Sequence, residues 1–278
     1  MKLPSTKVLA AALTLAFAGL PSQTTASHSW GGYHWARTSN PFTLKLGDNV
    51  SSTWDSYLAT TSSDWTASSV LNTTIVAGST TGRRCKPTAG RVEVCNEKYG
   101  NNGWLGLAQI WASGTHITQG AVKVNDTYFN TSTYNTPAWR NMVMCQEVGH
   151  TFGLDHQNED FSNANLGTCM DYTNDPDGGA GGAVENDPSN EHPNQHDYDE
   201  LAIIYGHNDS TTTVAAATAA AAEMPRAMVE HDYAERSQWG KLIRSSKNGL
   251  KEVYMLDFGQ GYKIFTFVTW AEGKGRGR

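Results

Sequence analysis

The chain has 278 residues, which allows one large domain or two modest ones and is enough to bury a substantial core. Its 21 basic and 27 acidic side chains give a net charge of −6, so charge alone argues against a nucleic-acid partner. Hydrophobic residues make up 38% of the chain and aromatic residues 10%, which fits a globular protein and excludes wholesale disorder.

Residues 1–26 have the pattern of a secretory signal peptide. Lys2 and Lys7 precede an apolar run from Val8 to Leu20, and small residues follow up to Ala26. The run is too short to span a bilayer comfortably, so we expect no membrane span. The alternative interpretation is a buried N-terminal helix. The mature chain is therefore predicted to be secreted, into a compartment where disulfides form.

Hydrophobic spacing predicts both helices and strands in the residues that follow. The predicted helices cover Trp54–Val70, Asn141–Phe152 and Asp197–Tyr205. The predicted strands cover Leu71–Val76, Leu105–Trp111 and Ala121–Val124. The segment from Asn158 to Asn194 is rich in Asp, Asn and Gly and is expected to be irregular.

Four cysteines allow three disulfide pairings. Cys85 and Cys95 flank a short segment that contains Gly and Pro, which favours a local bridge between them. That leaves Cys145 to pair with Cys169. The alternative is four buried thiols, which an oxidising compartment disfavours.

Charge and composition change near residue 210. Residues 27–222 carry 9 basic and 20 acidic side chains, whereas residues 223–278 carry 10 basic and 7 acidic ones. We predict a large acidic domain over 27–207, an Ala/Thr-rich linker over 208–225 and a small β-rich unit over 226–278. The strands expected in that unit are Trp239–Arg244, Leu250–Phe258 and Tyr262–Trp270, with a hairpin turn at Asn248-Gly249.

One stretch carries recognisable chemistry. It reads Gln146-Glu147-Val148-Gly149-His150-Thr151-Phe152-Gly153-Leu154-Asp155-His156. On a helix, Gln146 and His150 lie on one face, and Gly153 can adopt positive φ so that His156 swings round to face His150. Two imidazoles beside a carboxylate are what a catalytic zinc ion needs, because the carboxylate can act as a base toward a metal-bound water.

This stretch resembles the metzincin zinc peptidases, whose motif is H-E-x-x-H-x-x-G-x-x-H followed by a methionine turn. Met170 and Tyr172 stand where the matrixin, astacin and serralysin families would place the turn methionine and, in astacins and serralysins, a tyrosine that reaches the metal. The resemblance implies an α/β (α+β) fold with a mixed twisted sheet and an active-site helix. It implies a secreted zinc endopeptidase that hydrolyses peptides or proteins, with Glu147 as general base and Tyr172 as oxyanion stabiliser.

The chain departs from the family motif at its first position, where Gln146 replaces a histidine. An amide oxygen suits hard cations better than zinc. Three interpretations remain open. Gln146 binds zinc together with His150 and His156, with the Tyr172 phenolate completing the shell; or His192 or His196 supplies a ligand; or the site is degenerate and the domain is an inactive peptidase that binds a peptide or a surface.

Other polar residues have simpler interpretations. His34 and His116 lie near aromatic or strand positions and are interpreted as structural. The segment from Asp171 to Glu191 is interpreted as a solvated loop, with Ca²⁺ binding as the alternative, because its spacing matches no EF-hand loop. An extended substrate is expected to lie antiparallel to an edge strand at Ala121–Asn125. The oligomeric state is open.

Overall fold

The computed structural model of the chain describes residues 1, 28–161, 163–180, 184–215, 224–230 and 235–274. The predicted signal peptide therefore lies outside the described residues except for Met1, and so do residues 216–223 of the predicted linker. No described helix is long and apolar enough to cross a membrane.

One mixed sheet organises the described residues. Its strands run in the order β3-β2-β4-β6-β5-β9-β8-β7, and β1 pairs with β6. The strands are β1 (His34–Trp35), β2 (Phe42–Asn49), β3 (Leu71–Ala77), β4 (Val92–Glu97), β5 (Trp104–Ser113), β6 (His116–Asn125), β7 (Lys241–Ser245), β8 (Lys251–Asp257) and β9 (Tyr262–Trp270). The pairs among β1, β2, β3, β4 and β6 are parallel, and the pairs from β6 through β5 to β7 are antiparallel.

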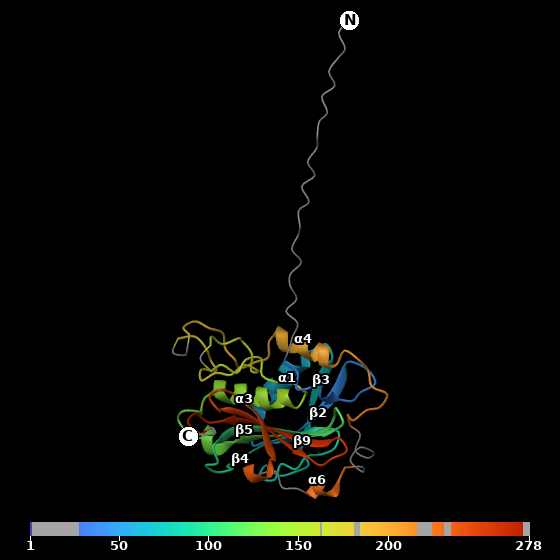
Figure 1. Cartoon of the computed structure of the whole chain (residues 1–278). Coiled ribbons are helices and arrows are strands. Elements are labelled where there is room, and N and C mark those ends of the chain that lie inside the picture. The colour runs from blue at the N-terminus through green and yellow to red at the C-terminus, as the bar shows by residue number, and fades with distance from the viewer. Residues whose placement is uncertain (2–27, 162, 181–183, 216–223, 231–234, 275–278) are drawn as a thin grey trace.

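Helices cover one face of this sheet. Figure 1 shows α1, α3 and α4 on that face and α6 on the opposite side. The helices are α1 (Asp55–Thr66), α2 (Asp126–Phe129), α3 (Pro137–His150), α4 (Gln195–Ile204) and α6 (Arg226–Glu230), with a 3₁₀ turn at Arg236–Gln238. The mixed α/β fold expected from the sequence is confirmed.

The helices and strands predicted from periodicity are present, with boundaries that differ by a few residues. The prediction missed β2 and β4. The C-terminal strands extend the main sheet, because β9 pairs with β5 from Trp104↔Trp270 to Ser113↔Tyr262. The proposed boundaries at residues 207 and 226 stay predictions, and the strands on either side of them share this one sheet.

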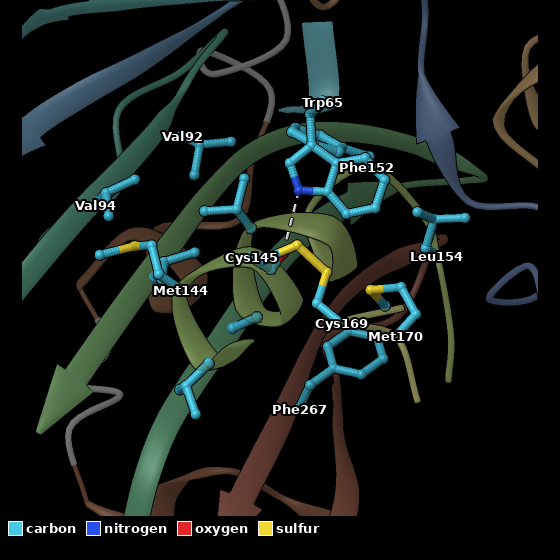
Figure 2. Close-up of a cluster of buried hydrophobic side chains, with 14 of the residues drawn as sticks. Trp65, Val92, Val94, Met144, Cys145, Phe152, Leu154, Cys169, Met170 and Phe267 are labelled. Atoms are coloured by element: carbon cyan, nitrogen blue, oxygen red, sulfur yellow. Dashed lines mark hydrogen bonds between the residues drawn. A yellow bond between two sulfur atoms is a disulfide. The ribbon is translucent and has the colours of Figure 1, made fainter. Parts of the chain in front are cut away.

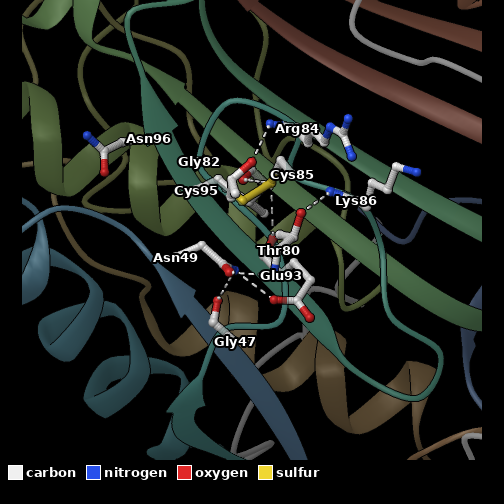
Figure 3. The surroundings of a disulfide bond; sticks show 12 residues. Gly47, Asn49, Thr80, Gly82, Arg84, Cys85, Lys86, Glu93, Cys95 and Asn96 are labelled. Atoms are coloured by element: carbon white, nitrogen blue, oxygen red, sulfur yellow. Dashed lines mark hydrogen bonds between the residues drawn. A yellow bond between two sulfur atoms is a disulfide. The ribbon is translucent and has the colours of Figure 1, made fainter.

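Both expected disulfides are present. Cys85–Cys95 attaches a loop to strand β4, with Asn49 and Glu93 hydrogen-bonded nearby (Figure 3). Cys145–Cys169 joins α3 to the segment that precedes Met170 (Figure 2). Two buried disulfides are typical of a protein from an oxidising compartment.

Helix α3 begins and ends where its sequence dictates. The Thr136 side chain accepts a hydrogen bond from the backbone N–H of Trp139. Pro137 occupies the first turn, where backbone N–H groups have no partner within the helix, so the N–H that proline lacks is not needed. At the other end Gly153 has φ 93°, and a Cβ there would lie 2.1 Å from the carbonyl oxygen of Tyr33. Only glycine fits this turn, which sends the chain back toward the helix.

Candidate metal and catalytic site

Helix α3 holds three of the predicted site residues on its buried side. Gln146 and Glu147 have no exposed surface, and His150 is 1% exposed. The turn at Gly153 brings His156 back to His150, so that their Nε2 atoms lie 3.1 Å apart and their rings are nearly perpendicular. The predicted convergence of the two histidines is present in the structure.

The hydrogen bond of His150 fixes the position of its proton. The carbonyl oxygen of Leu154 can only accept, so His150 Nδ1–H donates to it over 2.9 Å, which leaves a lone pair on Nε2. His156 Nδ1 faces the Glu159 and Asp155 carboxylates at 3.4 and 3.6 Å. Burial holds the pKa of both imidazoles well below the usual value, so both are neutral. Both Nε2 atoms can therefore offer a lone pair to a metal ion when the His156 proton lies on Nδ1.

The separation of 3.1 Å between the two Nε2 atoms fits a shared metal ion. Tetrahedral Zn²⁺ with Zn–N bonds of about 2.0–2.1 Å separates two ligand nitrogens by about 3.3 Å. His150 and His156 therefore fit zinc, each with its other nitrogen bound to an oxygen, as is usual for metal-binding histidines.

Gln146 is engaged elsewhere in this structure. Its amide nitrogen donates to the carbonyl oxygens of Cys169 at 2.7 Å and Asp171 at 3.3 Å, which fixes the direction of the amide. Its oxygen accepts a hydrogen bond from the Lys251 ammonium and faces the Thr269 hydroxyl at 3.2 Å. The oxygen that would bind a metal is thus held by a cation.

Lys251 is a site residue that the sequence analysis missed. It starts β8, is 2% exposed, and pairs in register with Thr269 on β9, whose hydroxyl accepts from Nζ at 2.6 Å. Its ammonium also lies 4.8 Å from the ring centroid of Tyr172. Burial lowers the lysine pKa to about 7. No local pattern separates this lysine from the exposed ones in the sequence, because strand pairing alone brings it here.

Glu147 lies in the same network. Its Oε1 accepts from the Thr269 hydroxyl at 2.5 Å, and its buried Oε2 has no hydrogen-bond partner among the described residues. Burial raises the pKa of this carboxyl to about 7, although Lys251 and the Thr269 hydroxyl act in the opposite direction. Glu147 thus keeps one buried carboxylate oxygen without a partner among the described residues, three residues before His150 on α3.

The predicted methionine turn lies against α3. A Cβ at Gly149 would meet the Met170 sulfur at 2.7 Å and the Trp65 ring at 2.8 Å, so glycine permits this close approach. Figure 2 shows Met170 in the same apolar cluster as Trp65 and Phe152. Tyr172 follows with its ring 4.7 Å from that of Phe161, and burial raises the pKa of its phenol. The phenol is therefore neutral here.

The strand predicted to bind substrate is not an edge. Ala121–Asn125 belongs to β6, which pairs with β4 on one side and β5 on the other, so that prediction was wrong. The period-two pattern marked a strand but could not give its place in the sheet. The antiparallel strand beyond β6 is β5, and β9 covers it along its length.

The other suggested ligands, His192 and His196, have partners of their own. His192 Nδ1 is 2.7 Å from the Asp64 carboxylate, and the His196 ring stacks on that of His28 at 4.9 Å. Among the described residues, two groups of three candidate ligands approach each other closely, and neither lies within residues 171–191. One of them, at Asp155–Glu159, is bridged by the guanidinium of Arg244.

Comparison with known proteins gives limited matches. No protein-family model and no curated protein matches the sequence. The structure of myroilysin is similar, with 12% identity and a TM-score of 0.37 over 66% of this chain and all of that chain. High choriolytic enzyme 1, a hatching-enzyme zinc protease from the medaka Oryzias latipes, matches with 11% identity and a TM-score of 0.34 over 65% of this chain and 98% of that chain.

Proposed function

We propose that this chain is a secreted zinc-dependent endopeptidase whose own C-terminal strands close the active site. The observation that carries the proposal is the neutral pair of His150 and His156, with Nε2 atoms 3.1 Å apart beside the buried Glu147. This arrangement has the two imidazoles and the adjacent base of a hydrolytic zinc site.

The roles follow from the positions of the side chains. His150 and His156 hold the metal, which when bound polarises a carbonyl and lowers the pKa of a water. Glu147 accepts the proton of the attacking water and delivers it to the amine that leaves. Tyr172 lies on the other side of Lys251 and is the candidate donor to the oxyanion once that lysine has moved.

Three contacts close the site. Strand β9 occupies the side of β5 where an extended substrate would add a strand. Lys251 on β8 engages the Gln146 oxygen. Arg244 on β7 pairs with Asp155 and Glu159, the carboxylates that face His156. The opposite charges of residues 27–222 and 223–278, net −11 and +3, favour this closed form.

Opening requires β9 to leave β5. Its departure together with β8 removes the ammonium from Gln146, so that the amide oxygen can complete the ligand set. The same step uncovers β5 for the substrate. The C-terminal strands therefore act as an internal inhibitor in this proposal.

A second candidate function is a binding domain without catalysis. It is favoured by the hydrogen bond between Lys251 and the Gln146 oxygen, which leaves the metal only two protein ligands in the closed form. In that case a peptide or a surface partner would replace the C-terminal strands on β5.

One experiment separates the two. A recognition sequence for a specific protease is inserted between residues 216 and 223, and zinc content and peptide hydrolysis are measured before and after cleavage. The fragment is released with a low concentration of denaturant that is then removed. Zinc binding with hydrolysis that appears only after release, and is absent in Glu147→Gln, supports the peptidase. Failure of the released protein to bind zinc and to hydrolyse any peptide supports the binding domain.

A further inference from the structure

Three histidines and an aspartate meet at the far end of the sheet, in residues that the proposed reaction does not use. His34 lies on β1 and His116 at the start of β6, and the parallel register places them opposite each other. His207 and Asp209 follow α4. The backbone N–H of Asp209 donates to the carbonyl of Arg37 at 2.9 Å, so main-chain bonds hold the segments together.

The side chains of His34, His116 and Asp209 converge, and His207 approaches two of them. Asp209 Oδ1 lies 3.4 Å from His34 Nε2, 3.2 Å from His116 Nε2 and 3.6 Å from His207 Nε2. The Nε2 atoms of His207 and His34 are 3.2 Å apart. Ligands of a tetrahedral zinc ion with bonds of about 2.0–2.2 Å are separated by about 3.3–3.5 Å. These four separations are close to that geometry. His34, His116 and Asp209 form a group in which every ligand atom approaches the others, and the exposed His207 side chain would turn toward His116 to join them.

The orientation of the His34 ring is fixed by its other nitrogen. The carbonyl oxygen of Gly32 can only accept, so His34 Nδ1–H donates to it over 2.8 Å. The Nε2 atom is thereby directed at Asp209 Oδ1 and His207 Nε2, which is the orientation that a metal-binding histidine needs.

The carboxylate is oriented by a second group. Arg37 donates to Asp209 Oδ2 through its guanidinium at 2.7 Å and its backbone N–H at 3.1 Å. The other oxygen, Oδ1, is thereby directed at the histidines. Carboxylates that bind metal ions are commonly held in this way by a hydrogen-bond donor on the other oxygen. The His34 and Asp209 side chains are 7% and 9% exposed, while those of His116 and His207 are 36% and 53% exposed and leave a path for an ion.

We propose that His34, His116, His207 and Asp209 bind one Zn²⁺ ion. Three imidazoles with a carboxylate select a transition metal over calcium, and four protein ligands leave no open position for a substrate. The ion would therefore be structural. It would fasten β1 and the segment after α4 to the sheet, next to the end of α3, where the Trp35 indole N–H donates to the carbonyl of Thr151 at 2.8 Å.

The test uses the full chain with His150→Ala and His156→Ala, so that the catalytic pair contributes no zinc. After treatment with a chelator, the protein is titrated with Zn²⁺, and with Co²⁺ to record the visible spectrum of the metal. His207→Ala removes one proposed ligand in this background. His192→Ala is the matched control, because that side chain is 52% exposed and lies beside Asp64.

We expect one zinc per chain, a tetrahedral Co²⁺ spectrum and a rise in the melting temperature with zinc. Because loss of an outer-shell partner already weakens metal sites by about 10–100-fold, His207→Ala should weaken zinc binding at least about tenfold. His192→Ala should change nothing. The proposal fails if the background protein binds no zinc, or if both variants bind it equally. If the background does not fold, the unaltered chain with His207→Ala must lose one zinc per chain. Failure of the proposed peptidase would leave this zinc in place.

Discussion

Removing the Cys145–Cys169 disulfide should reduce both stability and zinc binding. The bridge closes a loop with a sequence separation of 24 residues, and its cysteines are buried between α3 and the methionine turn. The loop-entropy relation gives about 3.4 kcal/mol for this length. For a chain of this size that corresponds to a melting temperature about 7–14 °C lower.

The other disulfide provides the matched control. Cys85–Cys95 closes a loop with a separation of 10 residues, for which the same relation gives about 2.7 kcal/mol. The two double Cys→Ala variants should therefore differ by less than about 1 kcal/mol in the free energy of unfolding. They should differ strongly in zinc affinity, because only Cys145–Cys169 joins the helix of His150 to Met170.

Denaturation in urea under non-reducing conditions measures the first effect, and titration with a competing chelator measures the second. Equal zinc affinity in both double variants would refute the idea that the bridge supports the site. A loss of stability below about 1 kcal/mol in the Cys145/Cys169 variant would refute the loop-entropy estimate.

Three further predictions concern single positions. Glu147→Gln should lower hydrolysis by the opened protein about 10²–10⁴-fold without changing zinc content, as peptide assays can show; activity within a few-fold of the original would remove Glu147 from the mechanism. Gly153→Ala should destabilise by at least about 2 kcal/mol in urea denaturation, because φ is 93° and a carbonyl oxygen would lie 2.1 Å from the new Cβ. Gly273→Ala is the control, because Gly273 has φ 74° but no atom lies within 4 Å of the new Cβ; it should lower the free energy of unfolding by about 1 kcal/mol. Equal losses in the two variants would contradict this account. Gln146→His combined with Lys251→Met should tighten zinc binding about tenfold or more. Gln146→His alone should tighten it less, because the Lys251 ammonium remains. Unchanged zinc affinity in the double variant would mean that position 146 does not face the metal.

The sequence predicted the helix of the site and the turn that follows it because both depend on local rules. The spacing of Gln146 and His150 fixes one helix face, and Gly153 supplies the positive φ that returns His156 to it. Strand β2 was missed although Phe42, Leu44 and Leu46 alternate with exposed residues, so its signal was present in the period-two pattern.

The remaining features depend on which strands become neighbours. Lys251 reaches Gln146 only because β9 pairs with β5 and β8 pairs with β9. His34 and His116 were interpreted singly as structural residues. Their approach to Asp209, and that of His34 to His207, joins three segments that are far apart in the chain, and no local spacing encodes it.

The proposed function gives one reason for both the glutamine at position 146 and the buried lysine at position 251. A buried ammonium needs hydrogen-bond acceptors, and the amide oxygen of Gln146 is an acceptor for Lys251. A histidine at that position, bound to zinc through one nitrogen and protonated at the other, would offer the lysine no lone pair. An amide can serve both forms, as an acceptor for Lys251 when the strands are in place and as an oxygen donor when they have left. On this reasoning Gln146 and Lys251 are coupled, and each should be tested with the other changed.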